Sequence, residues 1–116
     1  MQRLLLFFIA VLVVPVAAAQ GKKGPEKPPV FDQKFLSSAA NIETGRKVWD
    51  AQCRHCHGAA AYPGKAPKLK PGELEPDFIF DRVTNGFGKM PAWKDVFSLK
   101  ERMAVAAYIK SGEFSP

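Results

Sequence analysis

The sequence has few of the residues that bind metals or form disulfides. Its 116 residues include two cysteines and two histidines, and all four fall in the pentapeptide CRHCH, Cys53–His57. A structural zinc site needs four ligands, usually from two separated pairs, and no second pair exists. A thioredoxin-like CxxC pair requires a βαβ context, and no segment shows clear strand alternation. A CxxC disulfide without a cofactor would leave a small helical domain with too little core.

Long apolar runs are also scarce, and the one that exists lies at the N-terminus. Arg3 precedes an apolar stretch at 4–14, Pro15 interrupts it, and Ala17–Ala19 provides a small-residue cleavage site. This layout predicts a secretory signal peptide over residues 1–19. The run is short for a membrane span of about 20 residues, although an uncleaved anchor is the alternative. We therefore expect an exported, periplasmic protein, either soluble or held at the membrane by an uncleaved N-terminus or a partner.

The sequence lacks a strong charge of one sign. Removal of residues 1–19 leaves 16 Lys and Arg residues against 11 Asp and Glu residues, a net charge of +5. Neither an arginine–aromatic stripe nor a known nucleic-acid motif is present, so no nucleic-acid partner is expected. The moderate positive charge instead favours encounters with acidic protein surfaces.

Composition divides the mature chain into two parts. Residues 20–37 are rich in Gly, Pro and Lys, which predicts a flexible, loosely attached extension. Its larger apolar residues favour an alternative in which it docks on the domain or on a partner: Val30, Phe31, Phe35 and Leu36. Residues 38–116 form the predicted domain. A domain of about 80 residues has a thin core and usually needs a metal or covalent cross-link to support it.

Helix signals occur in three segments, so the predicted fold class is all-α. The helices are expected at about residues 42–53, 76–85 and 99–110. Asn41 is the expected N-cap of the first. In the second, Pro76 suits the first position and Gly86 the C-terminal stop. Ser98 and Glu101 form a capping box at the start of the third.

The pentapeptide matches the haem c attachment motif, Cys-x-x-Cys-His. Residues three apart at a helix end lie on one side, so the thiols of Cys53 and Cys56 can add to the two vinyl groups at one edge of a haem. His57 follows directly and is placed to ligate the iron. His55 points elsewhere on this geometry and is interpreted as a bystander.

The iron then needs a sixth ligand or an open face, and no third histidine is present. Met1 leaves with the signal peptide, so the candidates are Met90 and Met103. Met103 lies in the middle of a helix on an apolar face, which is typical of core packing. Met90 lies in a Gly-rich loop fixed by Pro91, where backbone can approach a ring closely. We therefore favour Met90 as the second axial ligand.

Four ordered segments together resemble a class I c-type cytochrome of bacterial type. They are Gly45-x-x-x-Trp49-x-x-x-Cys53-x-x-Cys56-His57-Gly58, Ala66-Pro67-Lys68-Leu69, Gly88-Lys89-Met90-Pro91-Ala92-Trp93 and Val105-Ala106-Ala107-Tyr108-Ile109. The resemblance covers roughly residues 40–112. It implies a small cytochrome c fold, in which three or more helices surround one covalently bound haem and the first and last helices cross.

The resemblance also implies residue roles around the haem. Cys53 and Cys56 would hold it, with His57 and Met90 as axial ligands to the iron. The Pro67 carbonyl would accept a hydrogen bond from Nδ1 of His57. Leu69 would pack on the haem face.

Further roles concern packing. Gly45 and Trp49 on the first helix would meet Val105 and Tyr108 on the last, because a glycine lets two helices cross closely. Two aromatic residues would line the haem or bond a propionate, with core packing as the alternative: Trp93 and Tyr62.

An iron whose two axial positions are both occupied by protein ligands predicts an electron carrier and not an enzyme. The protein would pass single electrons between periplasmic or membrane-associated redox partners. A fixed cytochrome subunit of a larger oxidoreductase complex is the alternative, and an open-iron haem enzyme or gas sensor is less favoured because distal acid/base residues are lacking. Five lysines around the expected haem edge would steer the protein to an acidic docking surface: Lys65, Lys68, Lys70, Lys89 and Lys94.

Overall fold

The computed structural model describes residues 25–59 and 64–114, so the expected signal peptide and Tyr62 lie outside the described residues. The elements follow in the order α1 (Gln33–Leu36), α2 (Ala39–Val48), the π-helix η1 (Trp49–Cys53), α3 (Arg54–His57), the 3₁₀-helix η2 (Pro71–Glu73), α4 (Pro76–Asn85) and α5 (Leu99–Lys110). Over the described ranges no strand forms, and only an isolated antiparallel bridge pairs Phe87 with Met90. In the same ranges no helix is long and apolar enough to cross a membrane. The all-α prediction is confirmed.

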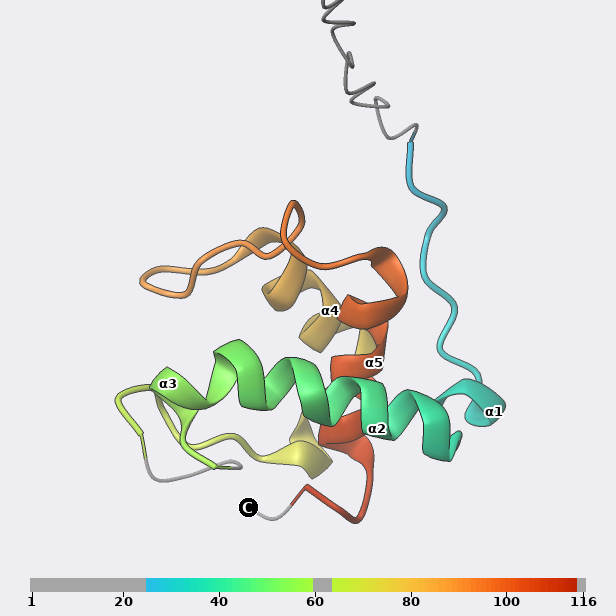
Figure 1. Cartoon of the computed structure of the whole chain (residues 1–116), viewed down its shortest axis with the longest axis horizontal. Helices are drawn as coiled ribbons and strands as arrows, with labels where there is room; N and C mark the ends of the chain where they lie inside the picture. The colour runs from blue at the N-terminus through green and yellow to red at the C-terminus, as the bar shows by residue number, and fades with distance from the viewer. Residues whose placement is uncertain (1–24, 60–63, 115–116) are drawn as a thin grey trace, which may run out of the picture.

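Two helices from opposite ends of the domain cross at close range. In Figure 1, α5 runs steeply behind the long rod formed by α2, η1 and α3. A Cβ atom built at Gly45 would lie 2.8 Å from the Tyr108 Cβ and overlap the Ala104 carbonyl. Only glycine fits this crossing, as the sequence predicted, and the contact brings the end of the chain to the start of the domain.

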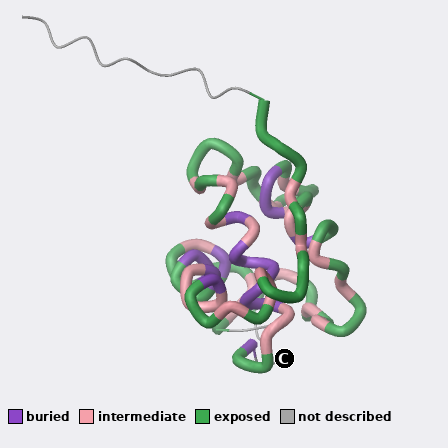
Figure 2. Tube along the Cα trace, turned by 90° about the vertical axis from the view of Figure 1, so that its right-hand side faces the viewer, coloured by how far each residue is buried: buried purple, intermediate pink, exposed green. Residues whose placement is uncertain are grey.

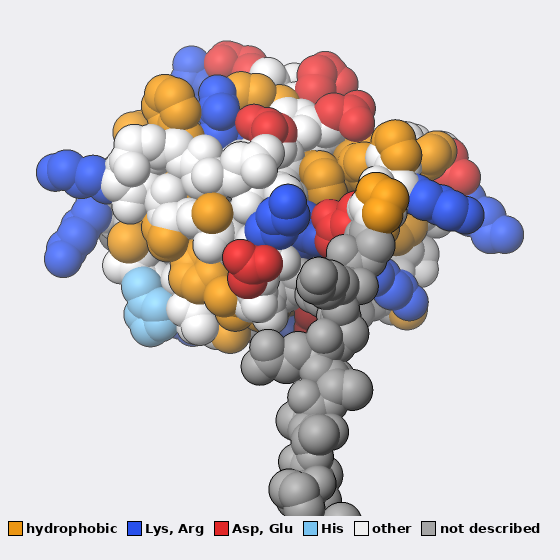
Figure 3. Space-filling view, turned by 90° about the horizontal axis from the view of Figure 1, so that it is seen from above, with side chains coloured by type: hydrophobic (Ala, Val, Ile, Leu, Met, Phe, Trp, Pro, Cys, Tyr) orange, Lys and Arg blue, Asp and Glu red, His pale blue; other side chains and the backbone are white. Residues whose placement is uncertain are grey.

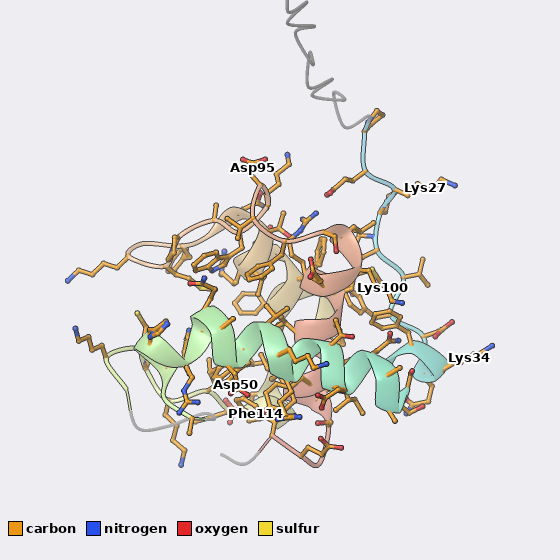
Figure 4. The ribbon with its side chains drawn as sticks, in the orientation of Figure 1. Lys27, Lys34, Asp50, Asp95, Lys100 and Phe114 are labelled. Carbon is orange, nitrogen blue, oxygen red and sulfur yellow. The ribbon has the colours of Figure 1, made fainter. Side chains whose placement is uncertain are left out.

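The buried residues gather in the interior of the domain (Figure 2). They come mainly from α2, η1, α4 and α5, and most of α5 is buried. Trp49 is the centre of this core, with ring centroids 4.9 Å from Phe114, 6.2 Å from Tyr108 and 5.4 Å from His57. Phe114 lies beneath the α2 rod in Figure 4, close to the end of the chain. The contacts with Phe114 and Tyr108 are edge-on and add directional packing to simple burial. They fix one side of the site described below.

The boundaries of the last two helices agree with the sequence, whereas the first predicted helix starts earlier and continues through η1 and α3 to His57. α4 begins at Pro76 and stops before Gly86, and the Ser98–Glu101 capping box of α5 is formed in both directions. The prediction that Asn41 caps the first helix is wrong. The helix begins three residues earlier, because the extended Ser38 accepts a hydrogen bond from the Asn41 backbone N–H. The Asn41 side chain is buried and instead donates to the Phe35 carbonyl at 3.1 Å.

Part of the expected extension contacts the domain, although none of its described residues is buried. Residues 25–37, called the strap below, run along the side of the domain that carries α1 in Figure 1. Phe31 packs against the core, with its ring centroid 6.0 Å from that of Phe80 on α4. The short helix α1 packs on α5, and Asp32 caps it by accepting from the Phe35 N–H. These contacts agree with the docked alternative at Phe31 and α1, whereas Val30 is 70% exposed.

Candidate cofactor site

A pocket opens between the α2–η1–α3 rod, α4 and the loop that follows α4. The empty space between its walls, including its open mouth, is about 510 Å³. Nearly all its walls are apolar, with Arg82, His57 and Cys53 as the exceptions. The lining residues are Trp49, Cys53, His57, Leu69, Leu74, Phe78, Ile79, Arg82, Val83, Met90, Val105 and Ile109. Four predicted site residues thus share one cavity, since Cys53, His57, Leu69 and Met90 all line it.

The rod changes its winding where it meets the site. The π-helix Trp49–Cys53 inserts a wider turn, and the Arg54 N–H donates to the Trp49 carbonyl across it. Such bulges rotate the helix face that follows and recur at functional sites. Cys53 is buried in the pocket wall, whereas Cys56 is exposed, and both thiols are free. Burial raises the pKa of the Cys53 thiol to about 12, so this sulfur is held as a neutral thiol.

The His57 imidazole packs against the Trp49 ring and lines the apolar pocket. Burial lowers the pKa of His57 below its ordinary value, which keeps the ring in the neutral form that ligates metals. Nδ1 is buried and makes no hydrogen bond within the described ranges. The hydrogen bond that the resemblance implied, from Nδ1 to the Pro67 carbonyl, is therefore absent from the structure, and Pro67 is exposed outside the pocket lining.

The chain after His57 folds back onto the CxxCH segment. The Trp49 indole N–H donates to the carbonyls of Gly58 and Ala59, both at 3.1 Å, which fixes the exit from α3. The Ala66 N–H donates to the Cys56 carbonyl at 2.8 Å. A Cβ at Gly64 would come within 2.6 Å of the His57 backbone, so this glycine permits the close approach. The fold-back precedes Leu69, which lines the pocket.

Met90 reaches the pocket from a tight turn. Phe87 and Met90 exchange backbone hydrogen bonds of 3.0 and 2.9 Å, and the Trp93 N–H donates to the Val83 carbonyl at 2.9 Å. Gly86 adopts φ 72°, and a Cβ there would lie 2.5 Å from the Met90 carbonyl oxygen. Only glycine accommodates this conformation at this approach. The backbone thus presents the Met90 side chain to the cavity.

The other named residues lie away from this cavity. Met103 is half-buried on α5 and is absent from the pocket lining. His55 is exposed, with Nε2 3.2 Å from the Ala51 carbonyl, as expected of a bystander. Trp93 packs against the core and against Phe97 instead of the pocket.

One wall of the pocket escaped the sequence analysis. α4 contributes four lining residues, Phe78, Ile79, Arg82 and Val83. Their i, i+1, i+4, i+5 spacing marks one helix face and was the available signal. The Arg82 guanidinium lies 4.6 Å from the Phe78 ring centroid and 4.3 Å from that of Phe87, so two exposed aromatic rings hold a cation at the pocket wall.

These residues fit a covalently attached haem. An apolar cavity suits the flat macrocycle, and a neutral imidazole with an unpaired buried nitrogen lines it together with a thioether sulfur. The described residues bring no three His, Cys, Asp or Glu side chains together as a metal cluster, so the donor set does not suit zinc.

Comparisons with known proteins agree with this chemistry. A family model described as "Cytochrome C oxidase, cbb3-type, subunit III" matches residues 40–109. Cytochrome c6 of Anabaena variabilis is 35% identical over 77 residues, covering 60% of this chain and 90% of the relative. The chloroplastic cytochrome c6 of Chlamydomonas reinhardtii is 33% identical over 82 residues, covering 63% of this chain, and this chain spans 55% of that relative's length.

Solved structures share the fold at lower identity. The c-type cytochrome NirC matches with a TM-score of 0.54 at 23% identity, covering 68% of this chain and 99% of that one. Cytochrome CL of Methylophaga aminisulfidivorans matches with a TM-score of 0.60 at 19% identity, covering 79% and 70%. The chain therefore belongs to the c-type cytochrome family that the matching family model describes, and it is an electron carrier with a covalently bound haem c and redox protein partners.

Proposed function

We propose that this protein carries single electrons between redox protein partners on a haem tethered by Cys53 and Cys56 and ligated by His57 and Met90. The observation that carries the proposal is the meeting of His57 and Met90, 33 residues apart in the sequence, in the lining of one apolar pocket. The haem iron supplies the one-electron couple. A thioether ligand and an apolar setting both favour the ferrous state and raise the reduction potential.

The pocket offers little for catalysis on a substrate. Among its described lining residues, the polar or ionisable side chains are those of Cys53, His57 and Arg82. The first two are assigned to the haem and its iron, and an arginine stays protonated, so it is a poor proton shuttle. A peroxidase-like reaction would need a positioned acid or base on an open iron face. This composition favours electron transfer over chemistry at the iron.

Removal of the Met90 sulfur tests the proposal. The ferric wild-type protein should show the weak near-infrared band of a Met sulfur–iron bond. Met90→Ala should lose this band, lower the reduction potential and open the iron to exogenous ligands. Met103→Leu is the matched control and should leave the band in place. A high-spin, five-coordinate spectrum in the wild type would overturn the electron-carrier proposal, and a band lost only in the control would reassign the ligand.

A partner surface is proposed around the pocket mouth. Phe87 is 68% exposed beside Arg82, and the five lysines named above are all exposed. Aromatic residues and arginine are the side chains enriched at protein interfaces. Figure 3 shows basic, acidic and apolar side chains mixed on the upper face, with Asp95 above the loop in Figure 4, so the positive steering is modest.

Salt dependence tests the electrostatic part of this surface. Raising the ionic strength from about 0.01 M to about 0.15 M shortens the Debye length from about 30 to about 8 Å. If the lysines steer the protein to an acidic redox partner, the second-order rate of electron transfer should fall severalfold over this range. A flat rate would contradict an acidic docking surface while leaving the haem assignment intact.

Location and assembly complete the proposal. The N-terminal pattern over residues 1–19 supports export to the periplasm, with or without retention at the membrane. A fixed subunit of a larger oxidoreductase is the second candidate, because the matching family is described by such a subunit. Purification under mild conditions separates the two: a monomer supports a shuttle, and co-purifying redox subunits support a complex.

A further inference from the structure

The strap ends in a contact that the electron-carrier proposal does not use. Near its N-terminal end, the Glu26 carboxylate pairs with the guanidinium of Arg102 on α5. The Arg102 side chain is fully buried, with 0% exposure, whereas that of Glu26 is 28% exposed. A buried cation is expensive unless it is paired and hydrogen-bonded. Glu26 therefore supplies the countercharge for Arg102, which lies 76 residues later in the sequence.

Arg102 joins the strap to both ends of the Met90 loop. Its Nη1 donates to the Thr84 hydroxyl at 2.9 Å, in the last turn of α4. Its Nε donates to the Phe97 carbonyl at 3.1 Å, where the loop enters α5. Thr84 and Phe97 flank the loop that carries Met90. The Arg102 guanidinium thus binds Thr84 and Phe97, the residues on either side of the loop that carries Met90.

Aromatic packing adds a second link between the strap and α4. Phe80 lies beneath the Arg102 guanidinium, with its centroid 5.3 Å from Cζ, and also contacts Phe31 of the strap. Cation–π and ring contacts of this kind are strongest when desolvated. The strap, α4 and the start of α5 are therefore coupled at one buried point.

We propose that the strap is a clamp on the Met90 loop, in which Glu26 acts through Arg102 as a positioning residue for the axial ligand. Glu26 is not among the described residues that line the pocket. It supplies the countercharge that orients the Arg102 guanidinium, and Arg102 binds the residues at the two ends of the loop. This inference rests on the proposed ligation of iron by Met90, and it gives the strap a role in setting how readily Met90 leaves the iron.

Displacement of Met90 by imidazole in the ferric holoprotein measures this role. Imidazole binds only when the loop releases the sulfur, so its affinity reports the loop's opening equilibrium. Glu26→Gln should bind imidazole about tenfold more tightly than the wild type, which corresponds to about 1.4 kcal/mol of opening free energy. Glu26→Asp keeps the charge on a shorter side chain and should give a smaller increase.

The matched control is Glu73→Gln, which makes the same charge change in an exposed pair with Lys70. It should leave imidazole affinity within twofold of the wild type. Far-UV circular dichroism at the assay temperature should be the same for all variants, because the clamp acts on the loop and not on the helices. Equal affinities for Glu26→Gln and the control would overturn the clamp, as would a gain accompanied by lost helicity. A wild type without the Met–iron band would instead overturn the proposed ligation itself.

Discussion

The two sides of the haem pocket are built in different ways. His57 is held by residues close to it in sequence: the Trp49 indole spans the exit from α3, and the Gly64–Ala66 fold-back bonds to the Cys56 carbonyl. The Met90 loop has local backbone hydrogen bonds of its own, but its two ends are held by distant residues, through Arg102 and, behind it, Glu26. The His57 side is therefore local and continuous with the core, and the Met90 side is a loop suspended between remote anchors.

This difference predicts unequal stability within one small domain. Opening of the His57 side requires the loss of Trp49 packing, and Trp49 is central to the whole core. Opening of the Met90 side requires only that the loop lift from its anchors, which is a local event of lower free energy. We expect the iron to lose its sulfur ligand well before it loses its histidine as conditions become harsher.

The largest effect is expected at Trp49. Trp49→Ala removes the ring that packs on His57, Tyr108 and Phe114, and large core truncations of this kind cost about 3–5 kcal/mol. Denaturant unfolding followed by far-UV circular dichroism should show this loss. The helical signal and the haem absorption should change together, because the His57 side belongs to the global core.

The comparison between the two sides would fail if Trp49→Ala disturbed only the axial ligation of the iron and left the stability of the helices unchanged. In that case the near-infrared band would disappear while the helices kept their wild-type unfolding midpoint. Such a result would place Trp49 in a local unit and not in the core. It would also remove the basis for treating the His57 side as the more stable one.

A medium effect is expected at Gly86. Gly86→Ala adds a Cβ at a positive φ and 2.5 Å from the Met90 carbonyl. With ψ at 177°, this backbone conformation is essentially restricted to glycine and costs another residue about 1–3 kcal/mol, and the clash adds to it. Because the strain falls on the loop, imidazole should displace Met90 at least tenfold more readily, with little change in helix content. Imidazole titration of the ferric protein measures this.

Gly88 offers the matched control for that substitution. It also has a positive φ, 56°, but a Cβ there would meet no atom within 4 Å. Gly88→Ala should therefore show the backbone cost alone and a smaller gain in imidazole affinity. Equal effects at the two glycines would mean that the approach to the Met90 carbonyl does not constrain the loop.

The local side of the pocket was also the predictable one. The CxxCH motif placed Cys53 and His57 because haem attachment depends on contiguous residues, and local capping chemistry placed α4 and α5. The sequence also predicted Met90 in the pocket, since few other ligands were available. The π-helix was missed because its wider turn depends on tertiary packing around Trp49, and no residue type marks it.

Long-range contacts explain the remaining differences. The Pro- and Lys-rich composition of the strap predicts a flexible extension, and nothing near Glu26 indicates its pairing with a buried arginine 76 residues later. The spacing of the lining residues on α4, around Arg82, did not identify a pocket wall, because the sequence does not show which surface this helix face packs against. The hydrogen bond from His57 to the Pro67 carbonyl is not formed in this structure, where Nδ1 has no partner among the described residues and Pro67 is exposed, so it stays a prediction for the haem-loaded protein.

The smallest effect is expected at Ser98, which lies between the two sides. Ser98 accepts from the Glu101 N–H at 3.2 Å and caps α5 directly after Phe97, the anchor of the Met90 loop. Ser98→Ala should cost about 1 kcal/mol, as the loss of an N-cap usually does. α5 packs against both sides, so thermal unfolding should shift by a few degrees while imidazole affinity stays within twofold of the wild type. A clear gain in imidazole affinity would mean that the first turn of α5 opens together with the Met90 loop. The boundary between the stable side and the opening side would then lie within α5.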